Sequence, residues 1–103
     1  MSKGLNAITR KILRETQLES AYAKLDIVKR ILESTQNSGA QEQGLMYASY
    51  LSYMQIDEYL SVMVATGLVK FDRASRIYRI TGKGMDFLAS IRQIDYLMKT
   101  IDT

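Results

Sequence analysis

The clearest hydrophobic pattern in the middle of the chain has helical spacing. Ile56, Leu60 and Met63 follow at intervals of four and three residues, which predicts an amphipathic helix with one buried face. An S-x-x-Q capping box begins at Ser52, and Gly67 follows where a left-handed cap is expected. We therefore expect a helix that begins after Ser52 and ends by Gly67.

Two short runs rich in β-branched and aromatic residues come next, at 68–71 and 76–80. Residues 73–75 separate them, which predicts a β-hairpin although the loop lacks the usual Gly or Asn. Because side chains alternate along a strand, one face would cover the core and the other would show Lys70 and Arg79 to solvent.

A further short helix is expected over residues 41–49, with Leu45 and Met46 turned inward and residues 50–52 forming a turn. Helix, turn, capped helix and hairpin then follow in the order of a winged helix-turn-helix domain. The expected fold class is mainly α with a small β-hairpin, a winged helix-turn-helix with a C-terminal dimerisation helix.

The N-terminal third carries two apolar stripes. The first lies on one helical face and comprises Leu5, Ile8 and Ile12. The second is out of phase with it and comprises Leu18, Ala21, Leu25, Val28 and Leu32. Two helices, one helix kinked near 15–17, or a frayed first segment of about fifteen residues would each explain this. The second stripe should be the first core helix, ending by 37–39.

The C-terminal segment predicts a last helix that Thr81 can cap. Gly82 and Gly84 near its start do not have the spacing of a phosphate loop, so we expect them to allow close packing. Along the helix an a/d pattern repeats at Phe87, Ile91, Ile94, Met98 and Ile101. This stripe predicts a homodimer; the alternative is that the first N-terminal stripe of the same chain covers it.

Length and composition set limits on the rest. The 103 residues, 47% of them hydrophobic, fit one compact unit with an N-terminal extension (1–20), a winged helix-turn-helix (21–84) and a dimerisation helix (85–103). There is neither a membrane-length apolar run nor a signal-peptide pattern, so we expect a soluble, cytoplasmic protein. Since Cys and His are both absent, we expect no metal site and no cofactor.

The net charge of +3 conceals an uneven distribution. Residues 1–14 and 70–83 each have a net charge of +4, whereas residues 15–69 have −4. Basic side chains can neutralise phosphates and release counterions, which makes both basic segments candidate contacts to nucleic acid. For the hairpin we favour phosphate contact over a merely solvated tip, because it is more basic than solubility requires. For the N-terminal segment both interpretations stay open.

The candidate DNA-binding residues form three groups. For backbone or minor-groove contact the hairpin offers Lys70, Arg73, Arg76 and Arg79. For the major groove the capped helix offers Ser52, Tyr53, Met54 and Gln55. The N-terminal segment adds Arg10, Lys11 and Arg14. On the outward face of the capped helix only Gln55 is a conventional base reader, and Glu58 would repel phosphates unless it accepted from a cytosine amine. We therefore predict weak sequence discrimination.

Several runs resemble one family: L-M-Y-A at 45–48, L-S-Y at 51–53, and Y-R-I-T at 78–81 followed by K-G at 83–84. They are similar to the small archaeal winged-helix proteins that include the 10a-type chromatin proteins of Sulfolobus. The resemblance covers residues 24–101. It implies an archaeal DNA-binding protein or transcriptional regulator that dimerises through an antiparallel pair of C-terminal helices.

The expected function is binding of double-stranded DNA as a homodimer, in transcriptional regulation or in chromatin, with no small-molecule effector evident. The alternative is a protein-interaction adaptor, which the acidic, Tyr- and Met-rich middle of the chain would suit. An enzyme is not expected, because Asp57 and Glu58 point about 100° apart on a helix and cannot converge on a substrate.

Overall fold

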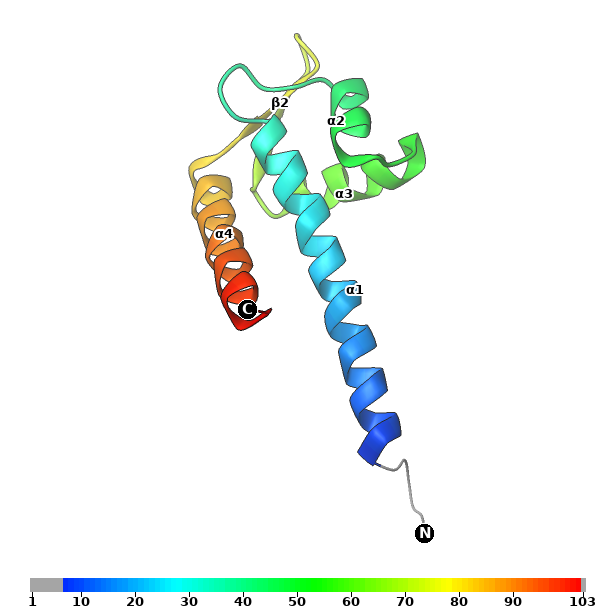
Figure 1. Ribbon diagram of the computed structural model, residues 1–103. Helices are drawn as coiled ribbons and strands as arrows, with labels where there is room; N and C mark the ends of the chain where they lie inside the picture. The colour runs from blue at the N-terminus through cyan, green and yellow to red at the C-terminus, as the bar shows by residue number, and fades with distance from the viewer. Residues whose placement is uncertain (1–6, 103) are drawn as a thin grey trace.

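The computed structural model describes residues 7–102, without the side chains of residues 9–19 and 102. Its elements follow in the order α1 (Ala7–Ser34), α2 (Glu42–Ser49), α3 (Tyr53–Ala65), β1 (Val69–Asp72), β2 (Ile77–Ile80) and α4 (Gly82–Asp102). In Figure 1, α4 lies beside α1, while α2, α3 and the hairpin gather around the C-terminal end of α1. This arrangement confirms the predicted mainly α fold with a small β-hairpin and a C-terminal helix, while dimerisation through that helix stays a prediction.

The core lies where all the helices meet the first strand. Among the described residues, the buried hydrophobic side chains are Ile31, Leu32, Leu45, Ile56, Leu60, Met63, Val69, Leu88 and Ile91. Each such side chain contributes roughly 1.5–3 kcal/mol when fully buried. The predicted inner face of α3 is confirmed, and its burial turns the opposite face of that helix to solvent.

Both ends of α3 are fixed as the sequence predicts. The Ser52 hydroxyl oxygen accepts from the Gln55 N–H at 3.3 Å, and the Gln55 side-chain oxygen accepts from the Ser52 N–H at 3.0 Å. At the other end Gly67 has a φ of 80°, and the Leu68 N–H donates to the Met63 carbonyl oxygen at 2.8 Å. These caps hold the exposed face of α3 in one position.

The hairpin pairs Lys70 with Arg79 and Phe71 with Tyr78 in an antiparallel register. Its turn extends one residue further than predicted, so that β2 begins at Ile77 and not at residue 76. Arg76 takes the left-handed conformation at φ 58°, which is why the turn closes without the Gly or Asn that usually occupies such a position.

Contacts at the base of the hairpin tie it to the helices. Ala40 pairs with Tyr78 through two backbone hydrogen bonds of 3.0 and 2.8 Å, so the segment after α1 forms an antiparallel β-bridge to the outer side of β2. Thr81 caps α4 as predicted, its hydroxyl oxygen accepting from the Gly84 N–H at 3.0 Å. A Cβ at Gly84 would overlap the Leu68 carbonyl oxygen, which confirms close packing there, whereas Gly82 has open space around it and that part of the prediction is wrong.

Helix α1 is continuous from Ala7 to Ser34, so the two-helix interpretation of the N-terminal third is wrong. The second apolar stripe only partly matches what is buried. Leu32 is buried as expected, Ala21 is exposed, and Ile31, which the stripe omitted, is buried in the core. The difference arises because α1 is enclosed on more than one side near its C-terminal end, where α2 and α4 both contact it.

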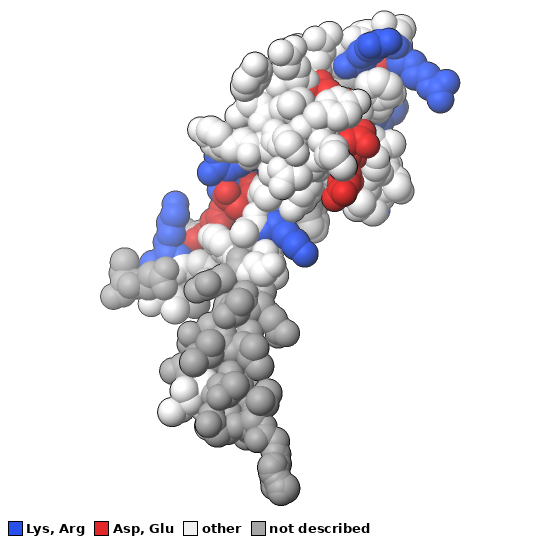
Figure 2. Space-filling model, turned by 90° about the vertical axis from the view of Figure 1, so that its right-hand side faces the viewer, with Lys and Arg blue, Asp and Glu red and all other residues white. Residues whose placement is uncertain are grey.

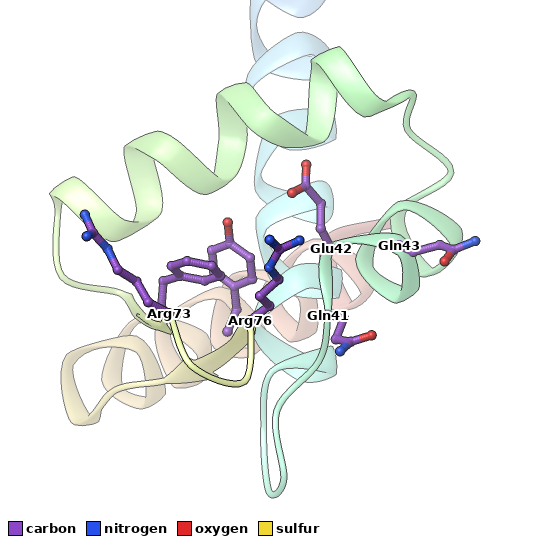
Figure 3. Close-up of a pocket in the computed structure, with 7 residues that line it drawn as sticks. Gln41, Glu42, Gln43, Arg73 and Arg76 are labelled. Atoms are coloured by element: carbon purple, nitrogen blue, oxygen red, sulfur yellow. The ribbon is translucent and has the colours of Figure 1, made fainter.

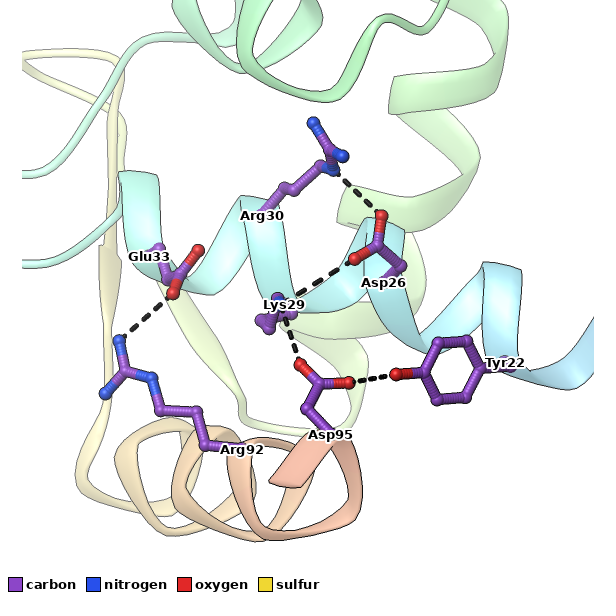
Figure 4. A network of polar contacts seen from close by, with 7 residues as sticks. All are labelled: Tyr22, Asp26, Lys29, Arg30, Glu33, Arg92 and Asp95. Carbon is purple, nitrogen blue, oxygen red and sulfur yellow. Dashed lines mark hydrogen bonds and ion pairs between the residues drawn. The ribbon is translucent and has the colours of Figure 1, made fainter. Parts of the chain in front are cut away.

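Polar contacts join α1 to α4, as Figure 4 shows. Asp95 accepts from the Lys29 ammonium at 2.7 Å and from the Tyr22 hydroxyl at 2.6 Å, and Arg92 contacts Glu33 at 3.1 Å. Because later residues of α4 meet earlier residues of α1, the helices are antiparallel. The N-terminal part of α1 extends beyond α4, which makes the molecule elongated, with extents of 61 × 30 × 22 Å (Figure 1).

Candidate nucleic-acid interface

The hairpin carries exposed positive charge. Lys70, Arg73, Arg76 and Arg79 are all exposed. Within the described part of the chain, the ion pairs shorter than 4 Å use other cations, namely Lys29, Arg30 and Arg92. Figure 2 shows blue side chains at the upper end of the molecule, where Figure 1 places the hairpin tip. The hairpin cations are therefore available to an external anion.

Two of these cations lie directly opposite each other, because the register pairs Lys70 with Arg79. Like charges in such a cross-strand pair destabilise a hairpin, and a bound anion between or beside them would relieve the repulsion. Lys83, which belongs to the same basic segment, has a structural contact instead: its ammonium donates to the Thr66 carbonyl oxygen at 2.7 Å, at the C-terminal end of α3.

Asp72 is the acid of the basic segment 70–83, and it shapes the turn. Its carboxylate accepts from the Ser75 hydroxyl at 2.8 Å and from the Ala74 N–H at 3.0 Å. These hydrogen bonds, that of Ser75 first, hold the pKa of Asp72 below its usual range. Through these hydrogen bonds the carboxylate stabilises the turn that carries Arg73 and Arg76 at its tip.

The predicted major-groove residues stand together at the start of α3. Ser52, Tyr53, Met54 and Gln55 are all exposed. However, in the capping box the side-chain oxygen of Gln55 accepts from the Ser52 backbone N–H, and the hydroxyl oxygen of Ser52 accepts from the Gln55 backbone N–H. Gln55 keeps only its amide N–H groups for a base, whereas adenine readout by an amide side chain needs both a donor and an acceptor.

The exposed face of α3 is acidic. Asp57 and Glu58 are both exposed, and residues 31–69 contain no Lys or Arg. Figure 2 shows red side chains lower on the same face of the molecule as the blue hairpin tip. Positive charge is therefore concentrated on the hairpin and not on the helix that would enter a groove.

The remaining predicted residues lie on α1 and α4. Arg10, Lys11 and Arg14 belong to α1, but their side chains lie outside the described ones. Of the predicted dimer stripe, Ile91 is only 2% exposed because the core of its own chain encloses it. Phe87, Ile94, Met98 and Ile101 stay exposed, Ile101 by 75%.

Two features of this region were missed at the level of sequence. Arg30 lies over the ring of Tyr50 at 5.5 Å, next to the turn that leads into α3, and its Nε contacts Asp26 at 2.9 Å. A groove separates the hairpin from the start of α2 (Figure 3). Only the four-residue spacing of Asp26 and Arg30 was visible in the sequence; the groove arises from packing between distant segments.

Comparison with known families agrees with this architecture. The family model described as "Winged helix-turn-helix" matches residues 23–99, which span the C-terminal part of α1, all of α2, α3 and the hairpin, and most of α4. The chain belongs to this winged helix-turn-helix family. A search of curated proteins found no match. None of the helices in the described residues is long and apolar enough to cross a membrane.

Proposed function

We propose that this chain binds double-stranded DNA as a homodimer and acts as a transcriptional regulator or a chromatin-associated protein. The observation that carries the proposal is the group of exposed hairpin cations without a carboxylate partner. Cations of this kind release counterions from DNA when they meet phosphates, and that release supplies most of the affinity that is independent of sequence. The hairpin would contact the backbone or the minor groove.

Helix α3 would dock against the duplex without reading much of its sequence. Its first turn offers the Tyr53 hydroxyl and the amide of Gln55, and the negative charge of Asp57 and Glu58 opposes a close approach to phosphates. We therefore expect unrelated duplexes to bind with similar affinity. A preference of about a thousandfold for one sequence would contradict this expectation, since that ratio is typical of specific readers.

The finer parts of the proposal rest on sequence. The resemblance to 10a-type chromatin proteins supports an archaeal origin, dimerisation through α4 and a place at the nucleoid in the cytoplasm. Arg10, Lys11 and Arg14 would extend the DNA contact along α1. Deletion of residues 1–16 should weaken both the dimer and DNA binding, and a truncated protein that matched the full chain in both would contradict the role of this segment.

The central test removes the two cations at the tip of the hairpin. The double variant Arg73→Ala/Arg76→Asn is suitable because Asn tolerates the left-handed conformation of residue 76 and so keeps the turn. We expect weaker binding to every duplex and a salt dependence flattened by about one unit per lost phosphate contact. Titration of labelled duplexes at several salt concentrations measures both quantities.

A matched control removes the same charge elsewhere. Lys24→Ala/Lys99→Ala lowers the net charge equally, and both of these side chains are exposed on α1 and α4. Its salt dependence should stay close to that of the unchanged protein. An equal effect of both double variants would show that net charge alone attracts DNA and would remove the hairpin from the mechanism.

A protein-interaction adaptor is the second candidate, and one observation favours it. Exposed aromatic and methionine side chains gather around the turn between α2 and α3, namely Tyr47, Tyr50, Tyr53 and Met54. Residues of these types are enriched at protein interfaces. The DNA titration separates the candidates, because an adaptor should show no salt-dependent DNA binding above background.

A further inference from the structure

The groove between the hairpin and α2 has walls of opposite charge. Its volume is about 650 Å³, within the range of small-molecule sites. Figure 3 shows Arg73 and Arg76 on the hairpin side, and Glu42 between them and α3. Gln41 and Gln43 also line the groove on the α2 side. A ligand that fills this groove meets a pair of cations on one wall and a carboxylate on the other.

Glu42 is held in this groove at a cost to stability. Its Oε2 atom is buried and has no hydrogen-bond partner among the described residues. Burial, and then the nearby negative charge of Asp57, raise the pKa of Glu42. An acid whose pKa is raised by folding lowers the free energy of unfolding as the pH rises through that pKa, so the ionised carboxylate is unfavourable at neutral pH. A hydrogen-bond donor on a ligand would offset this cost.

An aromatic pair completes the groove. Phe71 and Tyr78 stack with ring centroids 4.6 Å apart and planes inclined by 38°. Phe71 is 40% exposed, although it lies on the same face of its strand as the buried Val69. The negative charge of Glu42 also acts on Tyr78, since it raises the pKa of that hydroxyl after the larger effect of burial. The rings and the carboxylate therefore belong to one site.

We propose that this groove binds a nucleotide whose base carries an exocyclic amine. The base stacks on Phe71, Glu42 accepts a hydrogen bond from the amine, and Arg73 with Arg76 holds the phosphate. Stacking of a base on an aromatic side chain, and guanidinium contact to phosphate, are the general means by which proteins bind unpaired nucleotides. The site shares its arginines with the proposed duplex surface but does not depend on duplex binding.

The carboxylate distinguishes this ligand from the backbone of a duplex. A paired strand would bring phosphates towards Glu42 and Asp57, and its bases are stacked on one another, so that none is free to stack on Phe71. A nucleotide with a free base offers an anion to the arginines and a donor to Glu42 at once. Such a nucleotide exists either free in solution or in an unpaired stretch of nucleic acid, and the chemistry of recognition is the same.

The test has one arm for each source, and both use the full chain. In the first, calorimetric titration compares dAMP, dCMP and dGMP with dTMP, which lacks the amine, up to about 1 mM, the range of weak ligands. In the second, duplexes with an internal bubble of unpaired cytosines or unpaired thymines compete with a fully paired duplex. We expect amine-bearing bases to bind about tenfold more tightly than thymine in at least one arm.

Variants identify the groove as the place of binding. Phe71→Leu should weaken binding about tenfold by removing the stacking surface. Phe71→Tyr keeps an aromatic ring and should bind as tightly as the unchanged protein. Glu42→Gln should reduce the preference for amine-bearing bases without weakening dTMP binding, because the neutral amide oxygen is a weaker acceptor than a carboxylate and the amide N–H can donate to thymine. Glu58→Gln is the matched control, because it removes one exposed carboxylate from α3 outside the groove. Thermal unfolding of each variant checks that the fold is intact.

Each outcome decides the proposal. Binding of free nucleotides supports the proposal with a nucleotide in solution as the ligand, and preference for the cytosine bubble supports it with an unpaired stretch of nucleic acid as the ligand. In either case Phe71→Leu and Glu42→Gln must change the binding as expected. Equal binding of all four bases, or insensitivity to both substitutions, overturns the proposal. If the hairpin variants weaken duplex binding while Phe71→Leu and Glu42→Gln change nothing, the proposed function stands and the nucleotide site does not. If the protein binds nucleotides but not a duplex, the nucleotide site stands and the proposed function does not.

Discussion

Gly84 shows how one residue can join the wing to the last helix. It is buried at the start of α4, where a Cβ would overlap the Leu68 carbonyl oxygen and lie 2.8 Å from Ile80 Cγ1. The backbone of the hairpin and that of the helix approach each other here because no side chain intervenes.

We expect Gly84→Ala to lower the free energy of unfolding by about 1–3 kcal/mol, the usual effect of overpacking against backbone. For a domain of this size each kcal/mol lowers the melting temperature by about 4–8 °C. Thermal unfolding followed by circular dichroism measures this. Gly82→Ala is the control and should be neutral or slightly stabilising, since open space surrounds it and Ala favours helix. Equal effects would contradict the packing argument.

The same pair of glycines shows what sequence can and cannot predict about single residues. Their position in the first turn of a helix indicated close packing, but the sequence could not say that only Gly84 needs it, because the contacting atoms belong to residues 68 and 80. Similarly, the hairpin turn was predicted one residue too short because Arg76 occupies a conformation that Gly or Asn usually takes. Local propensity does not reveal a left-handed Arg.

At the scale of elements, periodicity predicted the helices well and their partners less well. The capping box, Gly67 and the apolar residues of α3 were all visible in the sequence, and that helix was predicted almost residue by residue. The stripe of α4 was visible too, but it is divided: Ile91 and the neighbouring Leu88 pack into the core of their own chain. A repeat identifies an apolar face without identifying what covers it.

The contact between α1 and α4 gives a prediction of pH dependence. Hydrogen bonds from Lys29 and then Tyr22 lower the pKa of Asp95 in the folded chain. An acid with a lowered folded pKa stabilises the fold above its unfolded pKa, and this contribution is lost as the pH falls through the folded value. Asp95→Asn should therefore destabilise the protein at neutral pH by about 1–2 kcal/mol, the range for hydrogen bonds to a charged group near the surface.

The measurement is chemical unfolding of both proteins from neutral to acidic pH. The difference between them should shrink as the pH falls below the ordinary pKa of Asp, because the unfolded chain then takes up a proton at this carboxylate. It should be lost once the pH passes below the lowered pKa of the native carboxylate. Asp86→Asn provides the control, since Asp86 is exposed on the same helix. A difference that stayed constant at all pH values would mean that Asp95 acts through packing and not through its charge.

For the whole molecule, charge was easier to predict than shape. The basic hairpin and the acidic helix-turn-helix follow from counting residues along the chain, and the structure places that positive charge at one end of the molecule. The groove beside α2 was not predictable, because its walls come from segments about thirty residues apart. The continuous α1 was also missed, because its two apolar stripes are out of phase with each other along the sequence.

The dimer is the prediction that belongs to the whole molecule. Ile94 and Ile101 lie on the exposed part of the stripe on α4, where one chain leaves them in contact with water, and an exposed apolar face of this kind is stabilised by a partner. We expect light scattering to give the mass of a dimer at micromolar concentration, and the double variant Ile94→Glu/Ile101→Glu to give that of a monomer.

The matched control is Ala89→Glu/Tyr96→Glu, which adds the same charge to exposed positions on the opposite side of α4. It should leave the mass unchanged, because only the stripe would be buried between chains. If the stripe variant is monomeric, its DNA binding should also lose affinity, since two hairpins on one duplex gain from effective concentration. A monomer mass for the unchanged protein would instead leave the apolar face of α4 to a different partner and make the single hairpin the complete DNA-binding unit.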